Sequence, residues 1–353
     1  MFRSTKSIIK ALAVTVSSIL PLATASGAIA QTEESQAMKK GESLYSHMKL
    51  KEAAEQFREV IRQEPNNAKA HQRLGAVLAA MEDYETAILE CKQSIKLDGK
   101  NFLPHVVLGQ IYANQRKMDS ALSEFEEACK LKPTSFRAHL DLGFAYTHMG
   151  KIEQAITAYK KAAEINPKDP TPHLNLGVLL AQDGKYPQAI EAEQQAITLD
   201  KRIPEAYINL GNIYAETGET QSATQAYKDA LKIAPGHPNA LSGLGWMQEK
   251  QGDLKGAVDT QRKALKSSPD FTPARRRLAV ALGKLGDSKQ AEAEFKSTLK
   301  STPRDVTAHV EYAQFLETQG QKDSAIAEYK KALEIQPDSK IAQDYLSKLS
   351  KTR

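Results

Sequence analysis

A repeat with a period of 34 residues constrains the fold of this chain more than any other feature. Stepping by 34 from Gly143 in either direction reaches a small residue every time. Twelve residues after each of these lies an alanine, from Ala53 to Ala325, so the register never slips. Such a period predicts a stack of similar units, each contacting only its neighbours. The small residues are Gly41, Gly75, Gly109, Gly143, Gly177, Gly211, Gly245, Ala279 and Ala313.

One period, residues 136–169, is typical of two helices joined by a turn. Apolar and small residues recur at helical spacing on both sides of Gly150, and Pro167 ends the unit. A glycine inside a helix costs about 1 kcal/mol relative to alanine. We therefore expect close packing of the paired helix, with the alanine twelve residues on against the glycine, to compensate. Glycines that suit left-handed helix ends recur at the turns: Gly150, Gly184, Gly218, Gly252, Gly286 and Gly320.

The period, the pair of small residues, the aromatic residues and the closing proline together resemble the tetratricopeptide repeat family. The resemblance covers residues 34–339 and implies an all-α fold, a right-handed superhelical solenoid of nine repeats. A polar lead-in, 31–36, precedes the repeats, and residues 340–353 are expected to form a C-terminal capping helix. The predicted repeats are 34–67, 68–101, 102–135, 136–169, 170–203, 204–237, 238–271, 272–305 and 306–339.

The first 30 residues have the pattern of a secretory signal peptide. Three basic residues precede an apolar run from Ala11 to Ala23, and small residues precede Gln31. A retained membrane anchor and an organellar transit peptide are the alternatives. We expect cleavage near Ala30 and a periplasmic or secreted mature protein without a membrane span.

Composition and motifs argue against nucleic-acid binding and catalysis. The formal net charge is +5, and three of the positive charges lie in the leader, so no extended basic groove is expected. The motifs of serine hydrolases, P-loop enzymes and zinc proteases are absent from the sequence. We predict no enzymatic activity and no cofactor. Whether Cys91 and Cys129 form a disulfide is left open.

Histidines four residues before the small position form a ladder that could suggest metal binding. Equivalent positions on successive repeats are separated by about 8–10 Å, whereas zinc ligands converge at about 2 Å. The histidines cannot share an ion, so we predict no metal site and a structural role between paired helices. They are His71, His105, His139, His173 and His309.

The family resemblance implies a concave groove lined by the first helix of each repeat. The positions three before and one after the small residue are expected to face it. Most of these residues are apolar, which indicates a partner site; alternatively, they pack between adjacent first helices. The candidate residues are Val106, Leu140, Phe144, Leu174, Val178, Ile208, Asn212 and Trp246.

A cationic patch, with Arg276 and Arg277 as candidate residues, lies nearer the C-terminus. Some members of the family clamp the carboxylates of acidic C-terminal peptides. Only Asn212 and Arg277 match that clamp. The expected lysines are replaced by Ile208 and Pro273, and the second asparagine by Gly243.

These observations predict an exported, non-catalytic scaffold for protein–protein interaction that binds an extended peptide or a partner helix in its groove. One alternative is a structural subunit of an envelope secretion or polysaccharide-export machine. Another is an accessory protein that presents substrate to a catalytic partner. Oligomeric state and partner identity are not predicted.

Overall fold

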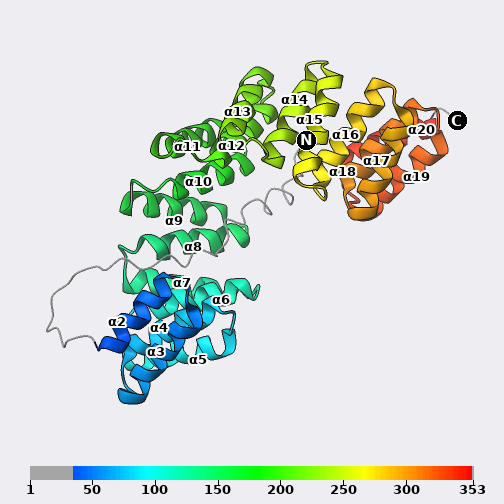
Figure 1. Ribbon diagram of the computed structural model, residues 1–353. Coiled ribbons are helices and arrows are strands. Elements are labelled where there is room, and N and C mark those ends of the chain that lie inside the picture. Colours follow the sequence, from blue (N-terminus) through cyan, green and yellow to red (C-terminus); the bar gives the residue numbers. More distant parts are fainter. Residues whose placement is uncertain (1–34, 352–353) are drawn as a thin grey trace. The chain divides into compact units, whose positions relative to one another are not determined.

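The computed structural model describes residues 35–351, and every regular element in that range is an α-helix (Figure 1). The all-α repeat solenoid expected from the sequence is confirmed. The predicted signal peptide and most of the lead-in lie outside the described residues. The helices of residues 35–351 are α2 (Gln36–Ser46), α3 (Leu50–Gln63), α4 (Ala68–Ala80), α5 (Tyr84–Leu97), α6 (Leu103–Asn114), α7 (Met118–Leu131), α8 (Phe136–His148), α9 (Ile152–Ile165), α10 (Thr171–Gln182), α11 (Tyr186–Leu199), α12 (Pro204–Glu216), α13 (Thr220–Ile233), α14 (Pro238–Lys250), α15 (Leu254–Ser267), α16 (Thr272–Leu285), α17 (Ser288–Ser301), α18 (Val306–Thr318), α19 (Lys322–Ile335) and α20 (Lys340–Lys351).

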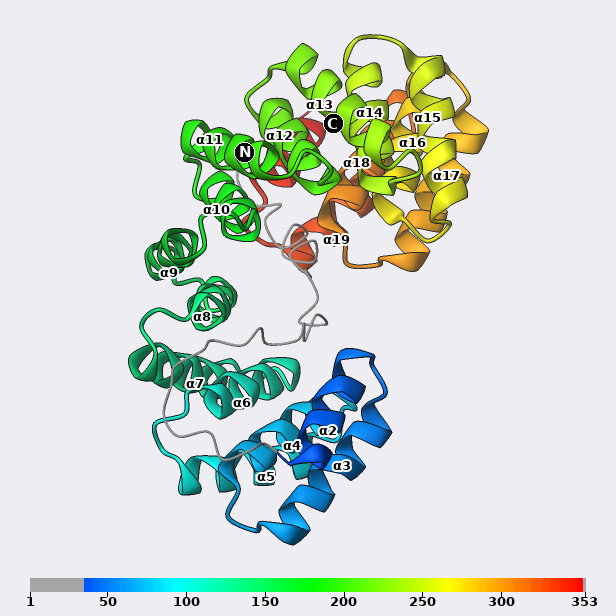
Figure 2. The same ribbon diagram turned by 60° about the vertical axis from the view of Figure 1, so that its left-hand side comes forward.

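The chain forms two compact units that divide between Lys185 and Tyr186, within the predicted repeat 170–203. In the N-terminal unit, α2, α4, α6 and α8 each pack on their paired second helix and follow one another in a row of first helices, whereas α10 packs on α9 (Figure 2). In the C-terminal unit, α12, α14, α16 and α18 form the equivalent row of first helices. Each unit is thus a stack of helix pairs with first helices side by side.

Four of the small glycines let an aromatic ring of the paired helix approach the backbone of the first helix, namely Gly41, Gly109, Gly143 and Gly211. A Cβ atom at Gly109 would lie 2.4 Å from a ring carbon of Phe125, and one at Gly143 would lie 2.6 Å from Tyr159. The ring sixteen residues after the glycine therefore fills the space that a side chain would need. The side chain nearest these glycines is therefore this ring, and not the alanine twelve residues on that the sequence predicted. The alanine twelve residues on is fully buried, but the larger ring supplies the atoms nearest the glycine.

Two repeats place a polar side chain where the others place this ring or a cysteine. Gln261 packs on Gly245 and donates a hydrogen bond to the Ser242 carbonyl at 3.0 Å, while its Oε1 is buried without a partner. Glu193 is fully buried and accepts a hydrogen bond from Asn209 at 2.9 Å; burial raises the pKa of Glu193 well above its usual range. Because an unsatisfied buried group costs about 1–3 kcal/mol, these repeats are less well stabilised.

The histidines before the small position link consecutive chain segments. His71 Nδ1 lies 2.6 Å from Glu90 Oε2 and Nε2 lies 2.9 Å from the Pro65 carbonyl. His309 makes the same two contacts with Glu328 and Pro303, at 2.6 and 3.1 Å. These two rings thus join their own helix to the paired helix and to the end of the preceding repeat, whereas among the described residues the ring of His105 bonds only to Glu124 and that of His139 only to the Pro133 carbonyl. These contacts agree with the structural role predicted from the sequence.

The turns after the first helices share a left-handed residue with a period of 34. Six of these residues are the predicted glycines, with φ between 70 and 93°. In the first three repeats the residue is Met48, Glu82 or Arg116, with φ of 59, 63 and 61°. A side chain in this backbone region costs roughly 1–2 kcal/mol, so these three turns are strained.

Replacing Glu82 with glycine is expected to raise the free energy of unfolding by about 0.5–1 kcal/mol, because glycine adopts the left-handed conformation without steric cost. Glu82 is exposed, so the change removes no core contact. Urea unfolding followed by circular dichroism measures the difference. Gly218→Ala, at the equivalent turn, should shift stability in the opposite direction. A loss of stability in the Glu82 variant would contradict the strain argument.

Candidate functional site

A cavity of about 470 Å³ lies in the C-terminal unit, lined mainly by the first helices of three consecutive repeats. Trp246 comes from α14, Arg277 and Val280 from α16, and Gln314 and Phe315 from α18. Aromatic and aliphatic walls with a few charged and amide groups are typical of ligand sites in proteins.

The lining follows a regular offset from the small residue of each repeat. The position one after it provides Trp246, Val280 and Gln314, and the position two before it provides Arg277 and Glu311. Residues at the positions two before and one after the small residue therefore face the cavity. The positions expected from the sequence are three before and one after the small residue, so only the second of these is correct for the cavity.

The position three before the small residue is used for packing in several repeats. Val106 and Ile208 are each only 5% exposed. Val106 packs with Ala128 and Ala138, and Ile208 with Ala223 and Tyr227. These two candidates therefore pack in the core, as the alternative interpretation expected, and do not offer a free surface to a partner.

The other candidates remain at least partly accessible. In the N-terminal unit, Leu140, Phe144, Leu174 and Val178 are half-buried. In the C-terminal unit, Asn212 is exposed and accepts a hydrogen bond from the Tyr227 hydroxyl at 2.7 Å. The residues brought together in one cavity are Trp246 and Arg277. Val280, Gln314 and Phe315 also line the cavity but were not predicted from the sequence. Val280 and Gln314 lie one residue after a small position, which is one of the two predicted offsets.

Arg277 is held against an aromatic ring. The carbon of its guanidinium lies 4.1 Å from the centroid of the Trp246 ring, within the range of a cation–π interaction. Burial lowers the pKa of Arg277 to about 10, and the positive charge of Arg276 adds to this effect. Arg276 forms an ion pair with Glu311, whereas Arg277 has none with any carboxylate of residues 35–351.

Positive charge exceeds negative charge around the cavity. Glu249 is paired with Lys284 at 2.7 Å, and Lys250 also lines the cavity. Glu311 uses one oxygen for Arg276, and its Oε2 atom is buried without a hydrogen-bond partner. With four cations and two carboxylates, counting Arg276, the site favours an anionic ligand. The lining cations are Lys250, Arg277 and Lys284, and the carboxylates are Glu249 and Glu311.

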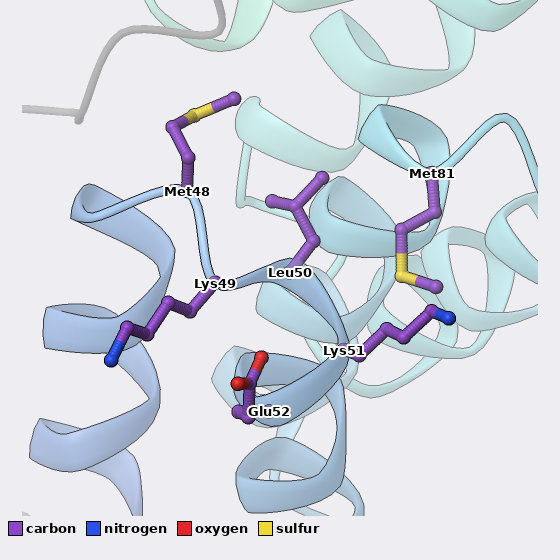
Figure 3. A pocket seen from close by; sticks show the side chains of 6 residues that line it. All are labelled: Met48, Lys49, Leu50, Lys51, Glu52 and Met81. Atoms are coloured by element: carbon purple, nitrogen blue, oxygen red, sulfur yellow. The ribbon is translucent and has the colours of Figure 1, made fainter.

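A second hollow lies at the turn of the first repeat in the N-terminal unit. It is lined by Met48, Met81 and residues 49–52. Figure 3 shows Met81 pointing toward the first turn of α3, while Met48 projects from the turn and is 67% exposed. Only Lys49, Lys51 and Glu52 bring charge to this lining, and each lies at the start of one helix. The C-terminal cavity is therefore the stronger candidate.

Other site chemistries are not supported in the part of the chain that the structure describes. No group of three or more His, Cys, Asp or Glu side chains there is arranged to hold a metal ion. Both cysteines are unbonded, and burial raises the pKa of each thiol to about 12. No helix in that range has the length and apolar composition needed to cross a membrane.

Comparison with family models gives three matches. Residues 101–311, more than half of the chain, match the Cilia and flagella-associated protein 70 C-terminal domain. Residues 38–101 and 306–339 match tetratricopeptide repeat models. The chain belongs to the tetratricopeptide repeat family. A comparison of this tetratricopeptide repeat protein with curated sequences gave no match.

Solved structures share the fold of this tetratricopeptide repeat protein at low sequence identity. A tetratricopeptide repeat protein from Parabacteroides merdae is 16% identical, with a TM-score of 0.61 over 70% of this chain and 98% of that one. The APC/C hetero-tetramer Cut9–Hcn1 is 18% identical in sequence, with a TM-score of 0.54. The match covers 89% of this chain but only 55% of that chain. Pseudomonas aeruginosa PilF is 20% identical in sequence, with a TM-score of 0.51. The match covers 60% of this chain and 97% of that chain.

Proposed function

We propose that this protein is an exported, non-catalytic scaffold that binds a peptide segment of a partner protein in the groove of its first helices. The cavity formed by Trp246, Arg277 and their neighbours carries the proposal, because it combines an aromatic anchor surface with an unpaired cation. Tryptophan and arginine are the residue types most often found to dominate binding energy at protein interfaces. The signal-peptide pattern of the first 30 residues supports export.

An extended peptide fits the spacing of this face. First helices of adjacent repeats lie about 10 Å apart, and an extended chain advances about 3.3 Å per residue. One repeat therefore corresponds to about three residues of ligand. The cavity spans three first helices, so a short linear segment can contact all of them. The APC/C structure with the same fold is that of a hetero-tetramer, and this is consistent with an assembly role.

Trp246→Ala is expected to weaken partner binding by about 30-fold or more, because a buried interface tryptophan contributes about 2 kcal/mol or more. The chain is immobilised, partners are captured from the envelope fraction of its source, and affinity is then measured with the purified partner. Trp246 is the only tryptophan, so a shift of its emission reports binding directly. Phe144→Ala with Leu174→Ala tests the same face of the N-terminal unit.

Lys263→Glu is the matched control, because Lys263 is exposed on the second helix α15 and lies away from the cavity lining. Binding that survives the changes at Trp246, Phe144 and Leu174 but is lost with Lys263→Glu would contradict the groove. That outcome would favour the alternative, a structural subunit of an envelope machine that assembles through its outer face.

A further inference from the structure

Three consecutive arginines of α16 are used in different ways. Arg275 donates to Glu294 at 3.1 Å and to the Pro269 carbonyl at 2.6 Å. Arg276 forms an ion pair with Glu311. Only Arg277 lines the cavity, where it stacks on Trp246. Two of the three cations are therefore neutralised within the fold, and the third is directed to the cavity.

The stacked position leaves the donors of Arg277 available. An arginine that lies over an aromatic ring keeps the N–H groups at the edge of its planar guanidinium, in the geometry that binds a carboxylate with two hydrogen bonds. Glu311 and Glu249 act on Arg277 through their charge, but neither forms a direct ion pair with it among residues 35–351, and a buried charge without such a pair is unfavourable. A carboxylate brought by a ligand would remove that cost for Arg277.

The rest of the lining indicates what accompanies the carboxylate. Val280, Phe295 and Phe315 form an apolar wall with Trp246. Glu311 Oε2 is buried and accepts no hydrogen bond, so it can receive an N–H group. A ligand that combines an apolar side chain, a carboxylate and an N–H donor is a peptide with an acidic residue next to a large apolar residue.

The carboxylate that fits this site is a side chain, not a chain terminus. Ile208, Pro273 and Gly243 stand where a clamp for a terminal carboxylate would need donor side chains. Asn212, the other residue that matches the clamp, does not line the cavity, so Arg277 is the only cation at those positions. One arginine matches one side-chain carboxylate. Lys250 at the lining adds positive charge for a further acidic residue of the same segment, while Lys284 is paired with Glu249.

On the basis of the peptide-binding function proposed above, we infer that the cavity selects an internal acidic segment of its partner. An aspartate or glutamate of that segment pairs with Arg277. A neighbouring aromatic or long aliphatic side chain lies against Trp246, Val280 and Phe315.

A random dodecapeptide library displayed inside a phage coat protein, which offers no free C-terminus at the site, is selected on the full-length chain. Selected peptides are synthesised with acetylated and amidated ends, as the free acid, and with each acidic residue changed to its amide. Their affinities are measured from Trp246 emission and, for variants of Trp246, from the anisotropy of a fluorophore on the peptide.

Selected peptides are expected to carry acidic residues beside an apolar one. Arg277→Gln should lower the affinity for these peptides on the order of tenfold or more, as loss of a charge-assisted pair does. Changing the key acidic residue to its amide should have a similar effect, while amidation of the C-terminus should change affinity less than about twofold. Arg277→Lys should give an intermediate loss, because the ammonium cannot form the paired hydrogen bonds. Arg275→Gln removes the same charge from the same helix and should leave affinity unchanged.

The outcomes separate this inference from the proposed function. Neutral or basic peptides that need Trp246 but bind Arg277→Gln normally would overturn the acidic segment and leave the groove intact. Peptides that bind only as free acids would overturn the side-chain assignment. Failure to select any peptide whose binding depends on Trp246 would overturn the groove itself. Circular dichroism of each variant excludes loss of folding as the cause.

Discussion

Tyr227→Ala is expected to lower the free energy of unfolding by about 3–5 kcal/mol, the range for removing a fully buried aromatic side chain. Tyr227 is fully buried in the C-terminal unit. A Cβ atom at Gly211 would lie 2.6 Å from its ring, and one at Gly243 would lie 2.4 Å from it. The ring thus fills the space beside glycines of two successive first helices. Neither glycine has a side chain that could move into the cavity left behind, so the structure cannot relax cheaply.

Urea unfolding followed by Trp246 emission and by circular dichroism measures this loss. Tyr227→Phe keeps the ring and removes only the hydrogen bond to Asn212, so it should cost about 1 kcal/mol. Leu89→Ala changes a side chain that is 67% exposed, so the free energy of unfolding of this variant should stay within about 0.5 kcal/mol of that of the parent. A cost below about 1 kcal/mol for Tyr227→Ala would show that the ring does not support the glycine contacts as we argue.

The fold was predictable because the period is a property of the sequence itself. The glycine at position 150 and its equivalents predicted the left-handed turns, and the structure confirms them with positive φ. The partner of Gly109 was not predictable in the same way. Helical periodicity identifies a buried face, but it does not tell which of Ala121 and Phe125 reaches the glycine. That depends on side-chain size and on the crossing of the two helices.

The site was only partly predictable, because periodicity within one helix does not fix how successive repeats are rotated. The structure shows a contact between successive first helices that helical periodicity does not predict. In three places, the residue one after a small position meets the residue two before the next small position, 31 residues later. Arg73 bonds to Glu42, Gln110 bonds to Asp141, and Arg277 stacks on Trp246. The residue types of these three pairs are complementary, so the signal for these contacts was present in the sequence.

The stability of the C-terminal unit is expected to fall as pH rises from mildly acidic to mildly basic values, because of His309. Both ring nitrogens of His309 face acceptors: Nδ1 faces Glu328 Oε2, and Nε2 faces the Pro303 carbonyl. Both hydrogen bonds form only when the imidazole carries two protons. The hydrogen bond with Glu328 raises the pKa of His309 above its ordinary value of 6.5, although burial and the charge of Lys331 oppose the shift. Arg275, one repeat earlier, makes the equivalent two bonds with a permanent charge.

The direction of the pH effect follows from this shift. The folded state holds the proton more tightly than the unfolded state, so the stabilisation is complete below about pH 6.5 and is lost as pH rises through the pKa in the folded protein. Hydrogen bonds to charged groups contribute about 1.5–3 kcal/mol, which sets the upper limit of the loss. His309→Arg copies the arrangement of Arg275 and should remove this part of the pH dependence between pH 5 and 9. Urea unfolding of the parent and of this variant across that range is the measurement. Parallel pH profiles for the two proteins would show that His309 is not the group responsible, whereas convergence at low pH and separation at high pH is the result that the geometry requires.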